Sequence, residues 1–407
     1  MNILLSAYAC SPILGSEPGA GWRWASELSN RYSVTLLTHP FFRDSIVAEL
    51  KTTPRPNLTV VYHEPRGLGV RRKRGSLNSR LYYMAWQLSA YLKARTLCRD
   101  NSYSLVHHIT WGTFRFPIFM GFLGIPFVLG PVGGGEKAPL KLLKTMPWKE
   151  QVREMLRIAF IAAASIDPIV RLCLSKASII FCRTNDSAAA LPVGRGPKIL
   201  VAQEIGAPIG NRQERNQGKP SEINLLYAGR LVGLKGVHLA IRAVALAHAR
   251  GINATLTIIG DGPLEEHLKA LAESLGVSNK ITFKGFLPQQ KLLDCYHESE
   301  VFIFPSLHDS GGNVVLEALS RGLPVICLDL GGPKHFVNNE CARVISTIKV
   351  GVNEVCERLS DRIVEMAIDP KLRLAMSNAA FDKAETLGWE AQISRIYDSI
   401  ENSGICK

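Results

Sequence analysis

The sequence predicts an α/β fold with two domains, each built on a doubly wound parallel sheet. Short apolar runs alternate with longer segments of helical periodicity in both halves of the chain, which is typical of successive β-α-β units. The 407 residues are enough for two or three separate hydrophobic cores. A polar, glycine-containing segment at 206–221 separates the halves, and we expect it to be a linker.

The domain boundaries follow from this division. We expect an N-terminal domain at 1–205, a C-terminal domain at 222–385 and a final helical segment at 386–407. Helices are expected near 22–30 and 43–50. In the N-terminal domain the predicted strands are 3–7, 34–37, 58–62, a run that begins at 104, 127–129, 178–182 and 198–202. In the C-terminal domain they are 223–228, 255–259, 281–284, 301–304, 324–328 and 342–345.

The composition indicates a globular protein and narrows its partners. The chain is 46% apolar and 20% charged, with a formal net charge of +13, which favours acidic partners. No nucleic-acid module accompanies this charge, so we expect a diphosphate substrate or an anionic membrane surface and no nucleic acid. The nine cysteines are scattered without a Cys-x-x-Cys pair, which favours reduced thiols in a cytoplasmic protein.

Two further absences complete these expectations. Neither His-Glu-x-x-His nor Asp-x-Asp occurs in the sequence, so no metal-binding motif is visible. The amino terminus lacks the basic segment of a signal peptide, and the longest apolar stretch, 158–166, is too short to cross a bilayer. We therefore expect a cytoplasmic protein that can lie on the inner face of the cytoplasmic membrane.

The most informative stretch is 308–333, where a strand, a loop, a helix and a second strand follow one another. Asp309 follows the strand, and the helix is predicted at 313–320 with Gly322 at its carboxyl end. Glu317 lies about two turns along that helix, on the face of Ser310 and Asn313. Ligands bind at this edge of an open α/β sheet, and the N–H groups of a helix start suit a phosphate. The alternative is an ordinary β-α-β unit with one capping acid and one exposed acid.

Two loops carry further candidate ligand groups. In Gly-Arg-Leu-Val-Gly-Leu-Lys-Gly, Arg230 and Lys235 lie between a strand and a helix, which suits a pyrophosphate whose charge grows as it leaves. After the first strand comes a turn with Gly15, Ser16 and Glu17, where glycine lets the backbone approach an anion. A tight turn without a ligand is the alternative for this second loop.

The Asp309-x7-Glu317 spacing resembles the Glu-x7-Glu signature of family-4 nucleotide-sugar glycosyltransferases, although the first acid is Asp. The Gly-Arg-x4-Lys-Gly pattern resembles the same family. The resemblance implies the GT-B fold, with two Rossmann-like domains facing across a cleft, and retaining transfer that needs no metal and no cofactor. It implies catalytic roles for His108, Asp309, Arg230 and Lys235. The implied donor-binding residues are Gly15, Ser16, Arg230, Lys235, Gly260, Phe286, Leu287, Asp309, Ser310, Gly311, Gly312, Asn313, Val314 and Glu317.

The resemblance also implies an acceptor side on the N-terminal domain. Its candidate residues are Glu17, His107, His108, Gly134 and Glu136. Neighbouring strand residues face opposite sides, so only one of the two histidines can face the cleft. We favour His108, with Thr110 on the same side; for each histidine the alternative is a core imidazole with hydrogen-bonded nitrogens.

Two basic segments favour docking on an anionic membrane surface. Arg71 to Arg74 form a dense run, and 138–164 mixes Lys and Arg with Trp148 and aliphatic residues, as in interfacial helices. The alternative is a helix packed on the domain.

The sequence thus predicts sugar transfer from a UDP- or GDP-type donor to a sugar or lipid-linked saccharide, as in bacterial cell-surface polysaccharide synthesis. The rival hypotheses are a GT-B sugar-nucleotide epimerase, a glycoside phosphorylase and a non-catalytic subunit that binds nucleotide sugar.

Overall fold

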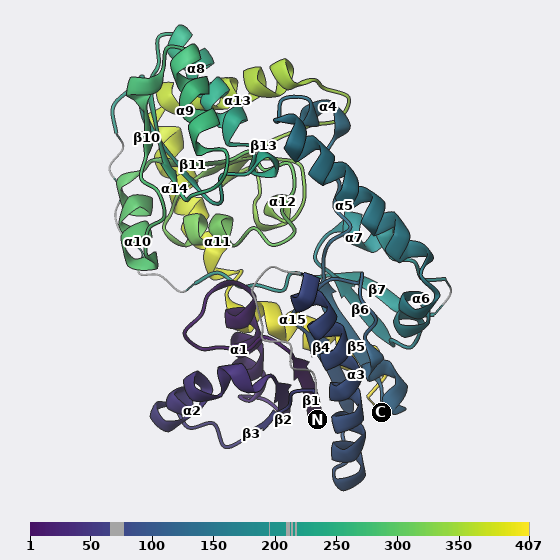
Figure 1. Ribbon diagram of the computed structural model, residues 1–407. Coiled ribbons are helices and arrows are strands. Elements are labelled where there is room, and N and C mark those ends of the chain that lie inside the picture. Colours follow the sequence, from purple (N-terminus) through teal and green to yellow (C-terminus); the bar gives the residue numbers. More distant parts are fainter. Residues whose placement is uncertain (66–76, 195, 209–211, 213–214, 216–217, 407) are drawn as a thin grey trace. The chain divides into compact units, whose positions relative to one another are not determined.

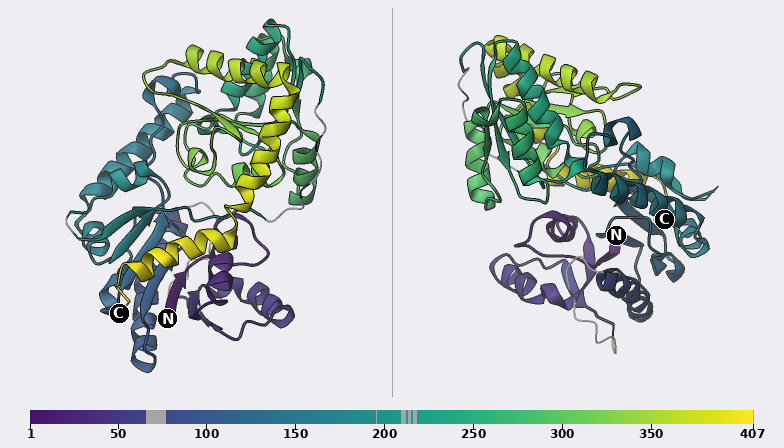
Figure 2. Two further views of the ribbon diagram at one scale, coloured as in Figure 1. Left: turned by 180° about the vertical axis from the view of Figure 1, so that it is seen from behind. Right: turned by 45° about the horizontal axis from the view of Figure 1, so that its top comes forward.

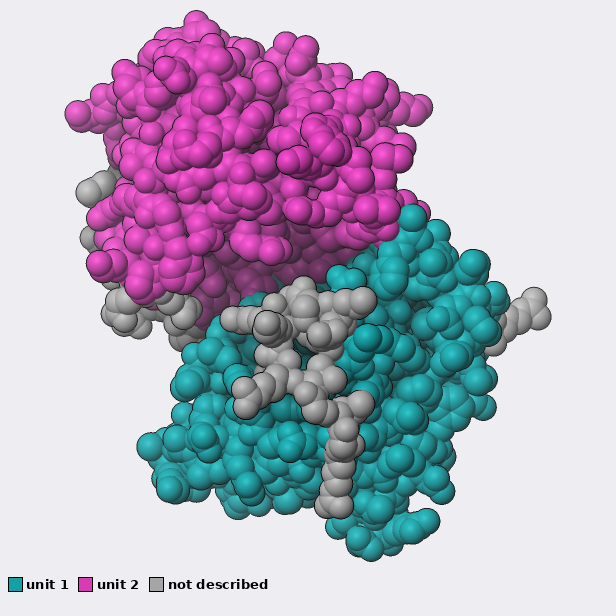
Figure 3. Space-filling model, viewed as in Figure 1, with its two compact units in different colours: residues 1–135, 159–205, 389–407 teal, residues 136–158, 206–388 magenta. Residues whose placement is uncertain are grey.

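The computed structural model describes the chain apart from residues 66–76, 195, 209–211, 213–214, 216–217 and 407. The described residues form two compact units (Figure 3). Unit 1 contains 1–135, 159–205 and 389–407, and unit 2 contains 136–158 and 206–388. Each unit is a parallel sheet with helices (Figure 1), as the alternation of apolar runs and helical segments predicts.

Unit 1 is built on a seven-stranded parallel sheet with the order β3-β2-β1-β4-β5-β6-β7. Its strands are β1 (Asn2–Ala7), β2 (Ser33–Thr38), β3 (Leu58–Tyr62), β4 (Leu105–Ile109), β5 (Phe127–Val132), β6 (Ile179–Cys182) and β7 (Lys198–Val201). All seven were predicted from apolar runs. They are mostly buried because helices cover the sheet, so their sequences are apolar rather than alternating.

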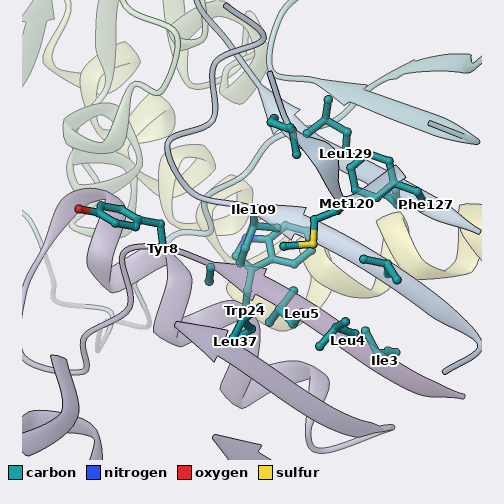
Figure 4. Close-up of a cluster of buried hydrophobic side chains, with 14 of the residues drawn as sticks. Ile3, Leu4, Leu5, Tyr8, Trp24, Leu37, Ile109, Met120, Phe127 and Leu129 are labelled. Atoms are coloured by element: carbon teal, nitrogen blue, oxygen red, sulfur yellow. The ribbon is translucent and has the colours of Figure 1, made fainter. Parts of the chain in front are cut away.

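The helices of unit 1 are α1 (Ser16–Leu28), α2 (Arg43–Thr52), α3 (Leu77–Asp100), α6 (Pro168–Ser175), α7 (Asn185–Ala190) and α15 (Trp389–Asn402), with short 3-10 turns at Pro40–Phe42 and Phe119–Leu123. The core residues of β1, among them Leu4 and Leu5, are fully buried together with Trp24 of α1 (Figure 4). A hydrogen bond from Trp24 Nε1 to the carbonyl of Glu204, 2.8 Å long, ties α1 to the segment after β7.

Helix α1 begins at Ser16, six residues before its predicted start near Trp22. Gly15 lies just before the helix, whereas Gly19 and Gly21, which precede its predicted start, lie inside its first two turns. A Cβ on Gly21 would lie 2.2 Å from the carbonyl oxygen of Ala9, and one on Gly19 would lie 2.5 Å from that of Leu14. These glycines therefore allow α1 to pack closely on the preceding backbone, which explains their presence without an anion.

Unit 2 is built on a six-stranded parallel sheet with the order β10-β9-β8-β11-β12-β13. Its strands are β8 (Glu222–Ala228), β9 (Asn253–Ile259), β10 (Ile281–Phe283), β11 (Val301–Phe304), β12 (Val325–Leu328) and β13 (Ala342–Ile345). Its helices are α4 (Leu140–Leu143), α8 (Val237–Ala249), α9 (Glu265–Ser274), α10 (Gln289–Glu298), α11 (Asn313–Ser320), α12 (Pro333–Phe336), α13 (Val352–Ile368) and α14 (Pro370–Glu385), with 3-10 turns η3 (Gly233–Lys235) and η4 (Ser278–Lys280).

The division of the chain differs from the sequence-based one at 136–158. These residues follow β5 of unit 1 but belong to unit 2, and α5 (Trp148–Ile166) begins in unit 2 and ends in unit 1. Their tertiary contacts decide this placement, since Leu142, Leu143 and Met146 are buried. At the other end, the chain leaves unit 2 after α14 and continues as α15 of unit 1 (Figure 2).

Within the described residues, no single helix is both long and apolar enough to cross a membrane. Helices α5 and α6 satisfy the length and composition criteria only when taken together, with a bend of 64° between them.

Candidate functional site

Lys235 and Asp309 form an ion pair at the carboxyl ends of β8 and β11. Lys235 Nζ lies 2.5 Å from Asp309 Oδ2, and both side chains are less than one-fifth exposed, at 18% and 17%. Gly236, with φ +70°, follows Lys235, and a Cβ there would lie 1.9 Å from the carbonyl oxygen of Pro305. Only glycine permits this close approach of the two loops. Residues 74 positions apart in the sequence are therefore held together by backbone packing.

Asp309 also binds the start of helix α11. Its Oδ1 accepts hydrogen bonds from the N–H groups of Gly311 and Gly312, both 3.1 Å long. Burial alone would raise the pKa of Asp309, but the charge and hydrogen bond of Lys235 and these two N–H groups outweigh burial and lower it. Asp309 therefore fixes the glycine loop just before α11, whereas the first turn of the helix itself, from Asn313 on, has no side-chain cap.

Glu317 lies on the predicted helix, whose observed bounds are Asn313–Ser320. The hydroxyl of Tyr296, on α10, donates to Glu317 Oε2 over 3.2 Å and also lies 3.3 Å from the carbonyl oxygen of Val314. Burial raises the pKa of Glu317, and the Tyr296 hydroxyl and the charge of Arg321 oppose the increase. Half-buried carboxylates that keep an unused oxygen can accept hydrogen bonds from ligand hydroxyls.

Arg230 precedes Lys235 on the same loop, and its side chain is exposed. The hydroxyl of Tyr227 lies 3.5 Å from the Arg230 carbonyl oxygen. Burial raises the pKa of Tyr227, Asp309 adds to the increase and Arg230 opposes it, so both charges lie near this hydroxyl. Arg230, Lys235 and Asp309 thus share one region of unit 2, as their strand-end positions predict.

The remaining donor candidates of unit 2 follow the same strand ends. Gly260 comes directly after β9, has φ +126° and donates its N–H to the carbonyl of Gly285 over 2.8 Å. Phe286, after β10, is 74% exposed, while Leu287 is half-buried. On the loop and first turn of α11, Asn313 is exposed, and Ser310 and Val314 are half-buried. Phe286 therefore presents an aromatic face to which a planar ligand group can stack.

Glu17 lies in the first turn of α1 and belongs to unit 1, as do exposed Gly15 and Ser16. Glu17 Oε1 accepts a hydrogen bond of 3.0 Å from the N–H of Gly112. Burial raises the pKa of Glu17 to about 7; the charge of Glu204 adds to the increase and that of Arg183 opposes it. Arg183 is itself paired with Glu204. Glu17 is thus a carboxyl group that changes charge near neutral pH.

This pKa predicts how the stability of unit 1 depends on pH. Glu17 in an unfolded chain titrates near 4.5 but in the folded chain near 7, so its contribution to the unfolding free energy is complete below 4.5 and is lost as the pH rises to 7. We expect Glu17→Gln to be more stable than wild type at about pH 8 and to lose less stability between about pH 5 and 8. Urea unfolding at both pH values measures this; exposed Glu390→Gln is the control, and equal slopes would contradict the assignment.

His107 and His108 are both buried in unit 1, at 0% and 2% exposure. His107 lies 3.0 Å from the hydroxyl of Tyr397 and 2.7 Å from the carbonyl oxygen of Gly130. His108 lies 2.9 Å from Ser6 Oγ, and its other nitrogen lies 3.3 Å from the hydroxyl of Tyr83. The two rings face opposite sides of the sheet, since Tyr397 is on α15 and Tyr83 on α3.

These contacts correspond to the core-histidine alternative for both residues. Burial lowers the pKa of His107 to about 4, against the effect of the hydrogen bond to Gly130, and that of His108 to about 3, helped by the charge of His107. Both imidazoles are therefore neutral near pH 7, and both nitrogens of each have protein partners. The preference for His108 as the residue that lines a ligand surface has no support in this geometry.

Gly134 and Glu136, expected together on the acceptor side, belong to different units. Gly134, with φ +100°, is in unit 1. Glu136 is in unit 2, where its Oε2 lies 3.6 Å from Nε2 of His308, the residue before Asp309. The sequence pattern predicted neither this contact nor the contact of Tyr296 with Glu317, because in each pair one residue lies far from the motif that contains the other. No group of three or more His, Cys, Asp or Glu side chains able to hold a metal ion occurs among the described residues.

Comparisons with known proteins find similarity to glycosyltransferases over part of the chain. The sequence model of glycosyl transferases group 1 matches residues 211–383. An uncharacterized glycosyltransferase of Methanocaldococcus jannaschii is 35% identical over 116 residues, 28% of this chain and 30% of that protein. The D-inositol 3-phosphate glycosyltransferase of Corynebacterium glutamicum is 28% identical over 206 residues, 48% of each chain. The chain thus spans half or less of the length of these relatives.

The fold likeness covers nearly the whole chain. HepE of Anabaena, whose structure was solved in complex with UDP and glucose, superposes with a TM-score of 0.56 at 16% identity, over 98% of this chain and 99% of that one. The likeness therefore extends through both units.

Proposed function

We propose that the protein transfers a sugar from a nucleotide-sugar donor to a saccharide acceptor, because the sequence model of glycosyl transferases group 1 matches residues 211–383 and the chain has the GT-B fold. The pairing of Lys235 with Asp309, beside Arg230 and on the same strand–helix unit as Glu317, carries the proposal. This arrangement brings two cations, Arg230 and Lys235, and two acids, Asp309 and Glu317, to one edge of the sheet within residues 211–383. The donor is of the UDP or GDP type, and UDP is favoured because HepE was solved with UDP and glucose.

Each group has a defined task in this proposal. Transfer forms a bond between an acceptor hydroxyl oxygen and the anomeric carbon and breaks the bond between that carbon and the diphosphate oxygen; negative charge grows on the departing diphosphate, which takes up the hydroxyl proton. Arg230 and Lys235 stabilise that charge, so the reaction needs no metal ion or cofactor. Asp309 holds the Lys235 ammonium in place, and Glu317 accepts hydrogen bonds from the ribose hydroxyls. The sugar keeps its anomeric configuration, and the acceptor is a sugar or a lipid-linked saccharide.

A ligand panel followed by product analysis tests the proposal. UDP-, GDP-, ADP- and dTDP-sugars are added separately, and the melting temperature should rise with one nucleotide class, since ligands that bind the folded state stabilise it. That donor is then incubated with saccharide acceptors in the presence of EDTA, and a new glycosidic bond should form. If none of the nucleotide sugars raised the melting temperature, the proposal would be overturned. A changed sugar without an acceptor would instead identify an epimerase, and transfer that requires added Mg²⁺ would remove the metal-independent part.

We further propose that α5 docks the enzyme on an anionic membrane surface, where a lipid-linked acceptor would be available. Trp148, Met155 and Leu156 are 68%, 62% and 67% exposed on this helix, and Lys149 is exposed beside them. Large exposed apolar side chains next to cations favour insertion into the headgroup region. The other basic run, Arg71 to Arg74, lies outside the described residues.

Replacing Met155 and Leu156 together by Ser should reduce the fraction of protein that pellets with phosphatidylserine vesicles. The two side chains bury apolar area when they insert, so we expect vesicle affinity to fall by about tenfold or more. Ile368→Ser, which removes a 57% exposed side chain from the end of α13, is the control. Unchanged pelleting of the double variant would refute docking through α5.

A further inference from the structure

Residues 136–158, here called the strap, pack on the loops of unit 2 that carry the candidate donor-binding residues. Met146 is buried against Gly233, where a Cβ would lie 2.2 Å from Met146 Sδ. The N–H of Gly233 donates to Glu150 Oε2 over 3.4 Å, and Thr145 Oγ1 lies 2.9 Å from His238 Nε2 on α8. The strap therefore covers the turn that presents Lys235, although it comes from the first half of the sequence.

At its amino-terminal end the strap places Glu136 beside His308. The carboxylate of Glu136 is 3% exposed and the imidazole of His308 is 20% exposed, and Oε2 and Nε2 are 3.6 Å apart. In its protonated form the imidazole forms an ion pair with this carboxylate. Because Glu136 is almost fully enclosed, its carboxylate can act on a ligand only through the residues that it contacts.

The backbone of Glu136 is itself fixed. Its carbonyl oxygen accepts a hydrogen bond of 2.7 Å from Arg157 Nη2, and Arg157 Nε donates to Glu154 Oε2 over 2.7 Å. Glu154 Oε1 also accepts from the N–H of Ala138 over 3.5 Å. These contacts close a short loop within the strap, so Glu136 provides a rigid anchor rather than a side chain that follows His308.

His308 in turn connects the two loops of the candidate site. Its N–H donates to the carbonyl of Leu234 over 3.3 Å, and Leu307 donates to the same oxygen over 2.8 Å. Leu234 precedes Lys235, and His308 precedes Asp309. A displacement of His308 would therefore change the separation of the Lys235 ammonium and the Asp309 carboxylate. Catalytic groups must be placed to within a fraction of an ångström, so such a change would weaken catalysis.

We infer that Glu136 is a positioning residue for the donor: through His308 it fixes the turn at Asp309 and thereby the Lys235 ammonium that meets the diphosphate. This inference rests on the proposed transfer reaction and deepens it, since it assigns the segment 136–158 to the donor site. It also replaces the expectation that Glu136 contacts the acceptor.

A double-mutant cycle tests the coupling. Glu136→Gln removes the carboxylate charge without changing the size of the side chain, His308→Asn removes the imidazole, and the full chain carries either change or both. Loss of this contact should raise the donor KM by about tenfold in each single variant and should also lower kcat, because a displaced Lys235 ammonium stabilises the departing diphosphate less well; the acceptor KM should change by about twofold or less. The donor KM of the double variant should be no higher than that of the more impaired single variant, because both changes break the same contact. Glu273→Gln, on the exposed face of α9, should match wild type.

A second readout does not depend on turnover. The rise in melting temperature caused by the nucleoside diphosphate alone should be smaller in both single variants than in wild type. Additive effects on the donor KM, or lower melting temperatures with an unchanged donor KM, would overturn the inference and leave Glu136 a structural residue. Failure of the proposed function is distinguishable, because wild type itself would then show neither transfer nor a nucleotide-dependent shift.

Discussion

Lys235→Ala should reduce kcat/KM for the nucleotide sugar by roughly a thousandfold, the typical effect of removing a group that stabilises developing charge. Lys235 is 18% exposed and already held 2.5 Å from Asp309, so its ammonium needs little reorganisation to meet a diphosphate. Its loss also leaves the negative charge of the Asp309 carboxylate uncompensated where the donor must bind. Steady-state kinetics with the donor selected by the ligand panel measures the effect.

The fold should survive this substitution. Asp309 keeps its hydrogen bonds from Gly311 and Gly312, and the backbone approach at Gly236 does not involve the lysine side chain. Circular dichroism should therefore match wild type, and exposed Lys371→Ala on α14 should have wild-type activity. Lys235→Arg should restore little activity, since a planar guanidinium does not replace a compact ammonium in this enclosed position. Wild-type turnover by Lys235→Ala would remove the assigned role.

Glu317→Ala should lower kcat/KM for the donor by roughly a hundredfold, because two hydrogen bonds between its carboxylate and ribose hydroxyls would be lost. The loss should appear mainly in the donor KM, with the acceptor KM unchanged. Tyr296→Phe removes only the hydroxyl that donates to Glu317 Oε2, so its effect should be smaller. Equal activity of Glu317→Ala and wild type would exclude the ribose contact.

The ionised side chain of Glu317 should also lower the stability of the folded protein. Burial raises the pKa of Glu317, so the charged form that a ribose contact requires is the form that burial disfavours. The contribution of Glu317 to stability is thus greatest at low pH and is lost as the pH rises through its folded-state pKa. Glu317→Gln should therefore melt no lower than wild type at about pH 8. A lower melting temperature would show that the carboxylate supports the fold.

The strands of both sheets could be predicted because buried parallel strands are continuous apolar runs. Helix α11 was predicted with its observed bounds because its apolar periodicity runs from Asn313 to Ser320 and Gly322 follows its carboxyl end. The start of α1 was missed because its glycines suggest a loop, whereas their lack of a Cβ serves close backbone packing. Local pattern alone cannot separate these two uses of glycine.

The candidate site was predictable to the extent that strand ends meet at one edge of a sheet. This principle brings Arg230, Lys235 and Asp309 together, but it does not show that Lys235 pairs directly with Asp309. Tyr296 and the strap were missed because their roles arise from contacts between elements far apart in sequence. The two histidines illustrate the same limit: strand alternation predicts that they face opposite sides, and only the packed structure shows that both sides are closed.

The chain passes between the two units four times, at 135–136, 158–159, 205–206 and 388–389. During synthesis, neither unit can therefore finish folding before the other has begun. Unit 1 is complete only once α15 has been synthesised, since the hydroxyl of Tyr397 on that helix contacts His107. Unit 2 includes residues 136–158, which are synthesised well before its first strand. A fragment starting at 206 would expose the apolar surface that Leu142, Leu143 and Met146 cover, so cutting the gene at the apparent linker would yield an aggregation-prone half.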